Sequence, residues 1–288
     1  MSRVTNTHEH SLSGLRAWAI SLGCAVGWGA FVMPGTLFLP TGGTLGSLVA
    51  LCAGGAAMAV IALCVSYLCG KEPNARGISG LVELVLGSDH AFLCSWTMVF
   101  AYAAIIWANC TSVVLLFRYL VGPMLQVGYL YQIGGYSVYT GEIVVTLLVI
   151  CAAGLLSLLP SRYVSAACTC MGIALVGGTV LMASYAFATH PNATDIFLPA
   201  YPLGSNATLG ILRIFALAPW AFVGFESVVH SSLRQKSSCK RLRRILLGAI
   251  VASTLIYLAT TVLAVMGTPI GARFRSWYSY VKSLDMLR

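Results

Sequence analysis

Charged residues are scarce in this chain. Asp, Glu, Lys and Arg make up 9% of the 288 residues, whereas hydrophobic residues make up 58%. Soluble domains carry about 25% charged residues. The mean hydropathy of +0.86 agrees with this imbalance. The composition therefore excludes a soluble globular protein and indicates one that lies largely within a membrane.

Motifs of catalysis and metal binding are also absent. The sequence has no phosphate-binding P-loop, no HExxH zinc site and no GxSxG nucleophile elbow. Nothing in it therefore indicates an enzyme or a bound cofactor. The 10 cysteines form no CxxC pair and no cluster with histidine. Most of them lie in apolar segments, so we interpret them as helix-packing residues rather than as a disulfide framework.

Long apolar runs fill most of the chain. A helix needs about 20 apolar residues to cross the hydrocarbon core of a bilayer. The turn signal Pro40–Gly43 carries no charge, which predicts a very short loop between the first two runs. We predict an all-α membrane protein with seven transmembrane helices, at about 17–40, 44–69, 91–117, 142–159, 163–189, 211–232 and 245–267.

The distribution of Lys and Arg predicts the orientation in the cell membrane. A cytoplasmic N-terminus, formed by residues 1–16, leaves only Arg118 and Arg213 at outer helix ends. The same orientation places these basic residues inside: Arg3, Arg16, Lys71, Arg76, Arg162, Arg234, Lys236, Lys240, Arg241, Arg243 and Arg244. The run at 234–244 could also bind anionic lipid, but topology alone accounts for it, and we expect no nucleic-acid partner.

The C-terminal end carries a second charge signal. Seven helices with an inside N-terminus leave the C-terminus outside, which is the reverse of a seven-helix receptor. Residues 268–288 form a basic tail on that outer side, and no further hydrophobic segment follows Gly267. We therefore expect this tail to result from a truncation or a frameshift.

Two of the predicted spans contain residues that interrupt helices. The first span includes VGWGAFVMPG at Val26–Gly35, and the sixth includes Pro219 and Gly224. Each Gly weakens a helix by about 1 kcal/mol and an interior Pro by about 3 kcal/mol. Single interruptions are common in membrane helices. A corresponding pair in two halves, however, indicates the substrate site of a secondary transporter, so we predict that helices 1 and 6 are discontinuous.

At these residues the chain resembles the amino acid–polyamine–organocation (APC) superfamily of permeases. The first-helix motif of that family is similar to Val26–Pro34, and its sixth-helix pattern to Trp220–Glu226. The second pattern looks closest to the basic amino acid/polyamine antiporter branch. A weaker similarity covers Pro73–Gly80, in the loop after the second helix. Trp28 stands where the family usually has a small residue, and the Glu common near the end of the second helix is absent.

The resemblance implies a LeuT-like fold of two inverted five-helix repeats. Residues 17–189 would form the first repeat, 190–210 an outer loop, and 211–267 the first two helices of the second repeat. Substrate would lie between helices one, three, six and eight, of which the eighth is missing here.

The resemblance also implies secondary-active transport of amino acids or related amines by alternating access. Free amides at a break attract a carboxylate, and free carbonyls attract an ammonium. The amides of 28–30 would hold the carboxylate, the carbonyls near Trp220 and Val223 the amine, and Trp220 would close over the ligand. The predicted substrate-binding residues are Gly27, Trp28, Gly29, Ala30, Phe31, Asn109, Trp220, Val223 and Gly224.

Two polar residues within the spans allow two interpretations each. Glu226 is the only acid well inside a predicted span, where it is costly without a partner. It could couple protons or form a gate, or it could pair with His230 and Arg234 on the same helix face. Asn109 could contact the ligand, although a helix–helix hydrogen bond is the commoner use of such a residue.

The alternative function is a truncated membrane protein that does not transport: a sensor, an assembly partner or the remnant of a decayed gene. The missing eighth helix favours this alternative. The intact motifs on both interrupted helices favour the transporter.

Overall fold

The computed structural model describes residues 14–72, 75, 77–133, 136–189, 197–202, 206–232, 239–269, 271 and 273. Residues 1–13, Arg234 and most of the basic tail lie outside this part. The elements in chain order are α1 (Gly14–Ala25), α2 (Gly29–Met33), η1 (Pro34–Phe38), α3 (Leu39–Lys71), α4 (Gly77–Leu86), α5 (Ser88–Val121), η2 (Gly122–Leu125), β1 (Tyr129–Ile133), β2 (Tyr136–Tyr139), α6 (Thr140–Leu158), α7 (Ser161–Thr189), α8 (Ala207–Leu217), η4 (Ala218–Phe222), α9 (Ser227–Ser232) and α10 (Cys239–Met266).

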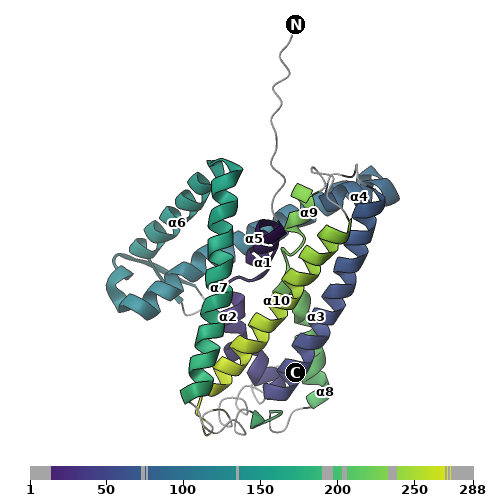
Figure 1. Ribbon diagram of the computed structural model, residues 1–288. Coiled ribbons are helices and arrows are strands. Elements are labelled where there is room, and N and C mark those ends of the chain that lie inside the picture. Colours follow the sequence, from purple (N-terminus) through teal and green to yellow (C-terminus); the bar gives the residue numbers. More distant parts are fainter. Residues whose placement is uncertain are drawn as a thin grey trace.

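Long apolar helices dominate this fold (Figure 1). Within the described residues, six stretches are long and apolar enough to cross a membrane: Gly29–Lys71, Ser88–Arg118, Thr140–Leu158, Tyr163–Thr189, Ala207–His230 and Cys239–Met266. This agrees with the predicted helical membrane protein. The first predicted span is divided, because α1 has only 12 residues and stands apart from the stretch that begins at Gly29. The count of seven helices therefore stays a prediction.

The predicted turn between the first two spans appears as a kink. Helical structure continues through Pro40 to Lys71, but Gly43 inside it has φ 68° and ψ −173°. A side chain there would be strained, and its Cβ would lie 2.5 Å from the carbonyl oxygen of Ala200.

Two elements were not predicted from the sequence. The segment between α5 and α6 contains an antiparallel hairpin, in which Tyr129 pairs with Tyr139 and Ile133 with Tyr136. The tyrosines of this segment agree with the hairpin, because aromatic residues favour strands. The segment after the second span, expected as a loop, forms the 10-residue helix α4 against α5.

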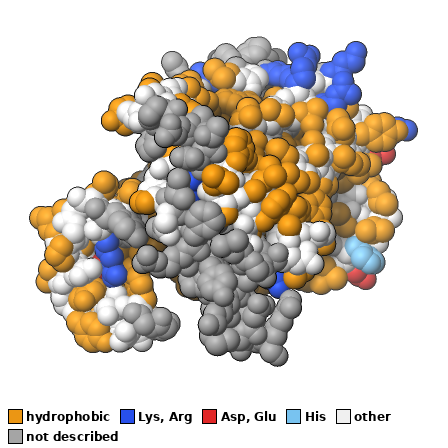
Figure 2. Space-filling model, turned by 90° about the horizontal axis from the view of Figure 1, so that it is seen from below, with side chains coloured by type: hydrophobic (Ala, Val, Ile, Leu, Met, Phe, Trp, Pro, Cys, Tyr) orange, Lys and Arg blue, Asp and Glu red, His pale blue; other side chains and the backbone are white. Residues whose placement is uncertain are grey.

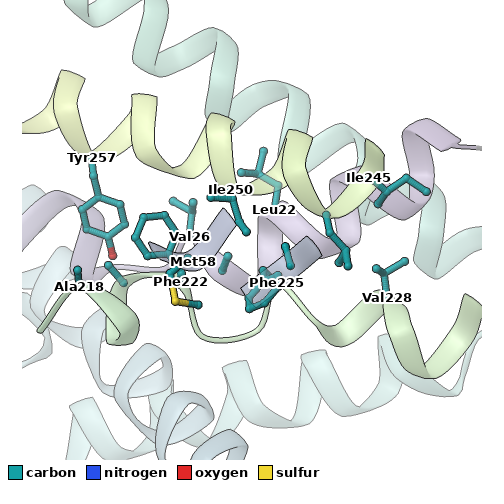
Figure 3. Close-up of a cluster of buried hydrophobic side chains, with 14 of the residues drawn as sticks. Leu22, Val26, Met58, Ala218, Phe222, Phe225, Val228, Ile245, Ile250 and Tyr257 are labelled. Atoms are coloured by element: carbon teal, nitrogen blue, oxygen red, sulfur yellow. The ribbon is translucent and has the colours of Figure 1, made fainter. Parts of the chain in front are cut away.

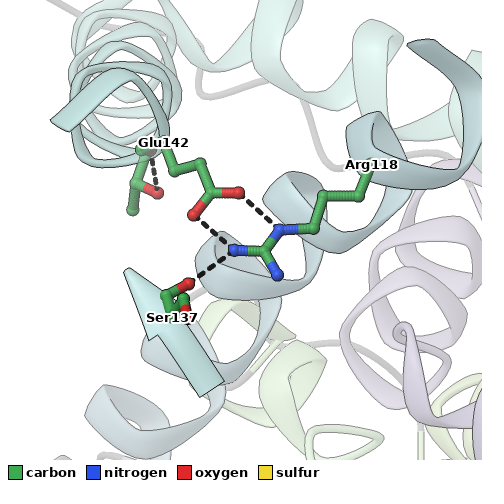
Figure 4. A network of polar contacts seen from close by, with 4 residues as sticks. Arg118, Ser137 and Glu142 are labelled. Carbon is green, nitrogen blue, oxygen red and sulfur yellow. Dashed lines mark hydrogen bonds and ion pairs between the residues drawn. The ribbon is translucent and has the colours of Figure 1, made fainter. Parts of the chain in front are cut away.

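A buried ion pair holds the hairpin to the helices (Figure 4). The Arg118 guanidinium at the end of α5 donates to both carboxylate oxygens of Glu142 on α6, and its Nη2 donates to the carbonyl of Ser137 at 2.7 Å. It also lies 4.2 Å from the ring centroid of Tyr136. Glu142 is only 3% exposed, so this pairing satisfies a charge that would otherwise be costly.

One end of the molecule gathers basic residues. A Cβ on Gly14 would lie 4.0 Å from Arg241, and one on Gly70 would lie 2.8 Å from the Cβ of Cys239. The starts of α1 and α10 and the end of α3 therefore share one end, at the top of Figure 1. This arrangement fits the predicted cytoplasmic face, which stays a prediction.

The apolar core forms where α1, α3, α10 and the interrupted sixth span meet (Figure 3). Leu22, Phe222 and Ile250 are among its fully buried side chains. The outer helices are far less enclosed. Only 6% of the most apolar stretch of α6 is buried, against 50% of the corresponding stretch of α10. Figure 2 shows the resulting surface, where hydrophobic side chains predominate. Such a surface suits contact with lipid.

Glycines allow the core helices to approach closely. A Cβ on Gly54 of α3 would lie 2.3 Å from the Cβ of Ala218, and one on Gly55 would lie 2.4 Å from Oγ1 of Thr254. Small residues serve this purpose at helix interfaces in membranes.

We predict that Gly54→Ala destabilises the protein because the added methyl group overlaps Ala218. Overpacking of this kind costs about 1–3 kcal/mol. The control is Gly178→Ala on α7, where a Cβ would meet nothing within 4 Å and where Ala is the better helix former. Thermal unfolding of both variants in detergent should show a lower midpoint for Gly54→Ala only. Equal midpoints would contradict the close packing.

Candidate functional site

The first span is interrupted between α1 and α2. Helix α1 ends at Ala25, Val26 and Gly27 are not helical, and helical structure resumes at Gly29. The Ala30 amide donates to the carbonyl of Gly27 at 3.1 Å, so the chain turns sharply at this point. The interruption lies where the glycines predicted it.

Several backbone groups at this break have no partner within the described residues. The amides of Gly27 and Gly29 donate no hydrogen bond there, since the residues that would bond them in a regular helix are out of reach. The last carbonyls of α1, at 23–25, accept none for the same reason. Unpaired donors and unpaired acceptors therefore stand within a few residues of each other.

Asn109 of α5 satisfies one amide of the break. Its Oδ1 accepts from the Trp28 amide at 3.3 Å, and its Nδ2 donates to the carbonyl of Ile105 at 2.9 Å. A Cβ on Gly27 would lie 2.8 Å from the same Oδ1, so glycine makes room for this contact. Asn109 thus links α5 to the first break, and a contact with the ligand stays a prediction.

The sixth span is interrupted between α8 and α9. Helix α8 ends at Leu217, a 3₁₀ turn follows over Ala218–Phe222, and α9 begins at Ser227. Gly224 has φ 104°, and a Cβ there would lie 2.6 Å from the carbonyl oxygen of Cys24. The two breaks are therefore in direct backbone contact.

Side chains hold the second break in place. The Ser21 hydroxyl on α1 donates to the carbonyl of Phe225. The carboxylate of Glu226 accepts from the Gly224 amide at 3.0 Å and from the Tyr102 hydroxyl at 2.8 Å. Both oxygens of Glu226 thus have donors, one at the break and one on α5.

His230 does not take the place expected beside Glu226. A Cβ on Gly77 of α4 would lie 2.3 Å from Nδ1 of His230, so this ring packs against the start of α4. Glu226 is thus held by Tyr102 and Gly224 rather than by His230, and Arg234, the other predicted partner, lies outside the described residues. A role in proton coupling stays a prediction.

Trp220 belongs to the second break, and its ring lies against the first. A Cβ on Gly29 would lie 2.7 Å from Cζ3 and 3.0 Å from Cη2 of the Trp220 ring. The Trp220 residue as a whole is 49% exposed. The ring therefore lies against the first break at Gly29, and its role as a gate stays a prediction.

A cavity of about 160 Å³ lies between the two breaks. Six of the predicted residues line it: Gly27, Trp28, Gly29, Asn109, Trp220 and Val223. Three others do not line it. Ala30 is fully buried, Phe31 is 49% exposed elsewhere, and Gly224 packs on Cys24.

Several lining residues were not predicted. They are Gly23–Val26 at the end of α1, Ile105 and Ala108 on α5, and Tyr257 on α10. Ile105 lies one helical turn before Asn109 and Ala108 directly before it, so both could have been inferred from the position of Asn109. Tyr257 lies in an apolar span without a break or a charge, so no sequence signal marked it.

Comparison with known proteins places the chain in a family. The family model described as amino acid permease matches residues 12–273. The chain belongs to the amino acid permease family. This confirms the predicted resemblance at family level, supports a role in membrane transport and points away from an enzyme. The antiporter branch stays a prediction.

A curated relative of this permease is the methylthioribose transporter of Bacillus subtilis (strain 168). It is 23% identical over 258 residues, which cover 87% of this chain and 54% of the relative. The chain thus spans about half the length of the curated relative it matches. No solved structure matches the chain.

The cavity of this permease is neutral. None of the side chains that line it within the described residues carries a charge. Glu226 is outside the lining, and its oxygens are engaged by Tyr102 and Gly224. The charges available to a ligand are therefore the partial charges of the unpaired backbone groups.

We predict that Gly29→Ala displaces the Trp220 ring, because the added Cβ overlaps its far edge. The matched control is Gly23→Ala, which also lies at the cavity but meets nothing within 4 Å. In variants that keep Trp220 as the single tryptophan, quenching of its fluorescence by iodide should increase for Gly29→Ala and stay unchanged for Gly23→Ala. Equal quenching in both would show that the ring does not rest on the first break.

Proposed function

We propose that this permease carries a small zwitterion, an amino acid or a related amine, across the cell membrane by alternating access. The observation that carries this proposal is that the first break holds two sets of unpaired backbone groups, amides and carbonyls. Free amides at 27 and 29 and free carbonyls at 23–25 border one cavity. Unpaired backbone groups within a membrane persist where they line a cavity, and a ligand can complete them.

The two sets of groups suit the two ends of an amino acid. The amides of Gly27 and Gly29 would bind the carboxylate, and the carbonyls at the end of α1 would bind the ammonium. The negative end of the α1 dipole adds to the attraction for the ammonium. The sequence predicted that carbonyls near Trp220 would bind the amine. We propose the carbonyls at the end of α1 instead, because they are unpaired within the described residues and border the cavity.

The size and lining of the cavity favour a compact ligand. A volume of about 160 Å³ is below the roughly 300 Å³ at which pockets for drug-sized ligands begin. The Trp220 ring would close over the bound molecule and open to release it.

A second candidate substrate is an uncharged polar molecule. The absence of charged side chains from the described lining suits such a ligand, and the relative from Bacillus subtilis is named a methylthioribose transporter. Methylthioribose therefore belongs in any test of the ligand.

We predict that alanine binds the protein in nanodiscs and changes its tryptophan fluorescence. N-acetylalanine lacks the ammonium and alaninamide lacks the carboxylate, so each should bind at least about 10-fold more weakly, as loss of a charge-assisted hydrogen bond implies. Trp220→Ala should weaken alanine binding more than Tyr131→Ala, since Tyr131 lies on the hairpin away from the cavity.

Three outcomes of this test differ in meaning. Binding of methylthioribose without alanine would replace the zwitterion by the second candidate. Alanine binding without uptake into proteoliposomes would favour the sensor or assembly partner. Binding of alaninamide as tight as that of alanine would contradict the role of the free amides.

Glu226 is proposed as the coupling group, with protons as the coupled ion. Protonation of Glu226 would leave one of its two donors, the Tyr102 hydroxyl or the Gly224 amide, without an acceptor. The second break would thereby be loosened. Uptake should then rise as the external pH is lowered, because the protonated form is the one that rearranges.

We predict that Glu226→Gln flattens this pH dependence with little change in affinity. Glutamine keeps an acceptor oxygen but cannot titrate. Glu83→Gln on α4, at an exposed position, is the control and should behave like the unmodified protein. A pH profile of uptake that is unchanged in Glu226→Gln would assign this carboxylate a purely structural role.

A further inference from the structure

Tyr257 brings to the cavity a polar group that no contact within the described part of the chain satisfies. The residue is 1% exposed and lines the cavity. Its ring is held by Phe38 and Phe222, with centroids 6.4 Å and 6.3 Å away. Figure 3 shows its oxygen directed toward the interrupted sixth span, beside Ala218.

The hydroxyl of Tyr257 has no hydrogen-bond partner within the described residues. The side-chain oxygens that are fully enclosed there without a partner are those of Thr44, Ser227 and Ser253. Tyr257 differs from these three because it borders the cavity. An enclosed hydroxyl without a partner is unfavourable, so a ligand that supplies one gains affinity.

Packing alone does not require this oxygen. The neighbours of the ring are aromatic and aliphatic, and a phenylalanine would fill the same space between Phe38 and Phe222. The oxygen is therefore the part of Tyr257 that the core leaves unexplained.

We infer that Tyr257 is a substrate-binding residue whose hydroxyl pairs with an uncharged polar group on the substrate side chain. This inference rests on the proposed function. The break of the first span binds the two charged ends, and Tyr257 reaches the same cavity from α10. The preferred substrate is a small neutral amino acid with a hydroxyl group, such as serine.

The same lining disfavours a cationic side chain. A second ammonium, besides the one that the carbonyls at 23–25 bind, would have no carboxylate beside it within the described lining, since that lining is uncharged and Glu226 is engaged by Tyr102. Removing a charge from water without a partner is strongly unfavourable. Lysine should therefore bind more weakly than serine, in contrast to the basic amino acid/polyamine branch suggested by the sequence motif.

The test compares serine with alanine, which differ by one hydroxyl. Binding to the full chain in nanodiscs is measured for the unmodified protein, Tyr257→Phe and the control Tyr185→Phe, whose side chain is 73% exposed on α7. Serine should bind about 3- to 10-fold more tightly than alanine to the unmodified protein and to Tyr185→Phe. In Tyr257→Phe the ratio should fall to about 1, with alanine binding and the unfolding midpoint unchanged.

The outcomes separate this inference from the proposed function. An unchanged serine-to-alanine ratio in Tyr257→Phe overturns the role of Tyr257 and leaves the zwitterion proposal in place. Lysine binding as tight as that of serine overturns the neutral substrate class. If alanine, serine and lysine all fail to bind the unmodified protein, the proposed function and this inference fail together.

Discussion

The contact between Gly224 and the end of α1 fixes the position of the two breaks. No side chain fits at Gly224, because its Cβ would lie 2.6 Å from the carbonyl oxygen of Cys24 and its φ of 104° suits only glycine. The backbones of the first and sixth spans therefore meet directly. Trp220 and Glu226 lie close to Gly224 in the sequence, so this contact sets where they lie relative to the first break, whereas Asn109 reaches that break from α5.

Hydrogen bonding within the breaks then decides which groups remain for a ligand. A membrane offers no water to backbone groups, so each interruption of a helix leaves donors and acceptors to be satisfied. Asn109 satisfies Trp28, and Glu226 satisfies Gly224. Within the described residues, the amides of Gly27 and Gly29 and the carbonyls at 23–25 remain without a partner. The proposed site is thus defined by these groups, and under that proposal the neutral lining makes them the main source of attraction.

Much of this arrangement could be predicted from the sequence, because glycine, proline and charge act locally. The scarcity of charged residues predicted a membrane protein, and the motifs at Val26–Pro34 and Trp220–Glu226 predicted both interruptions and the permease family that comparison confirmed. The hairpin and α4 were missed, because both lie between predicted spans and both are too short to give the signal of a membrane-crossing helix.

The class of protein, the family resemblance and the places where helices break could all be predicted without a structure, since each depends on composition or on a few adjacent residues. The hydrogen-bond partners could be identified only once the helices were packed together. Glu226 bonds Tyr102 rather than His230, and Tyr257 reaches the cavity from a span without any local signal. Such pairings join residues that are distant in the chain, and their geometry follows from how closely the glycines let the helices pack.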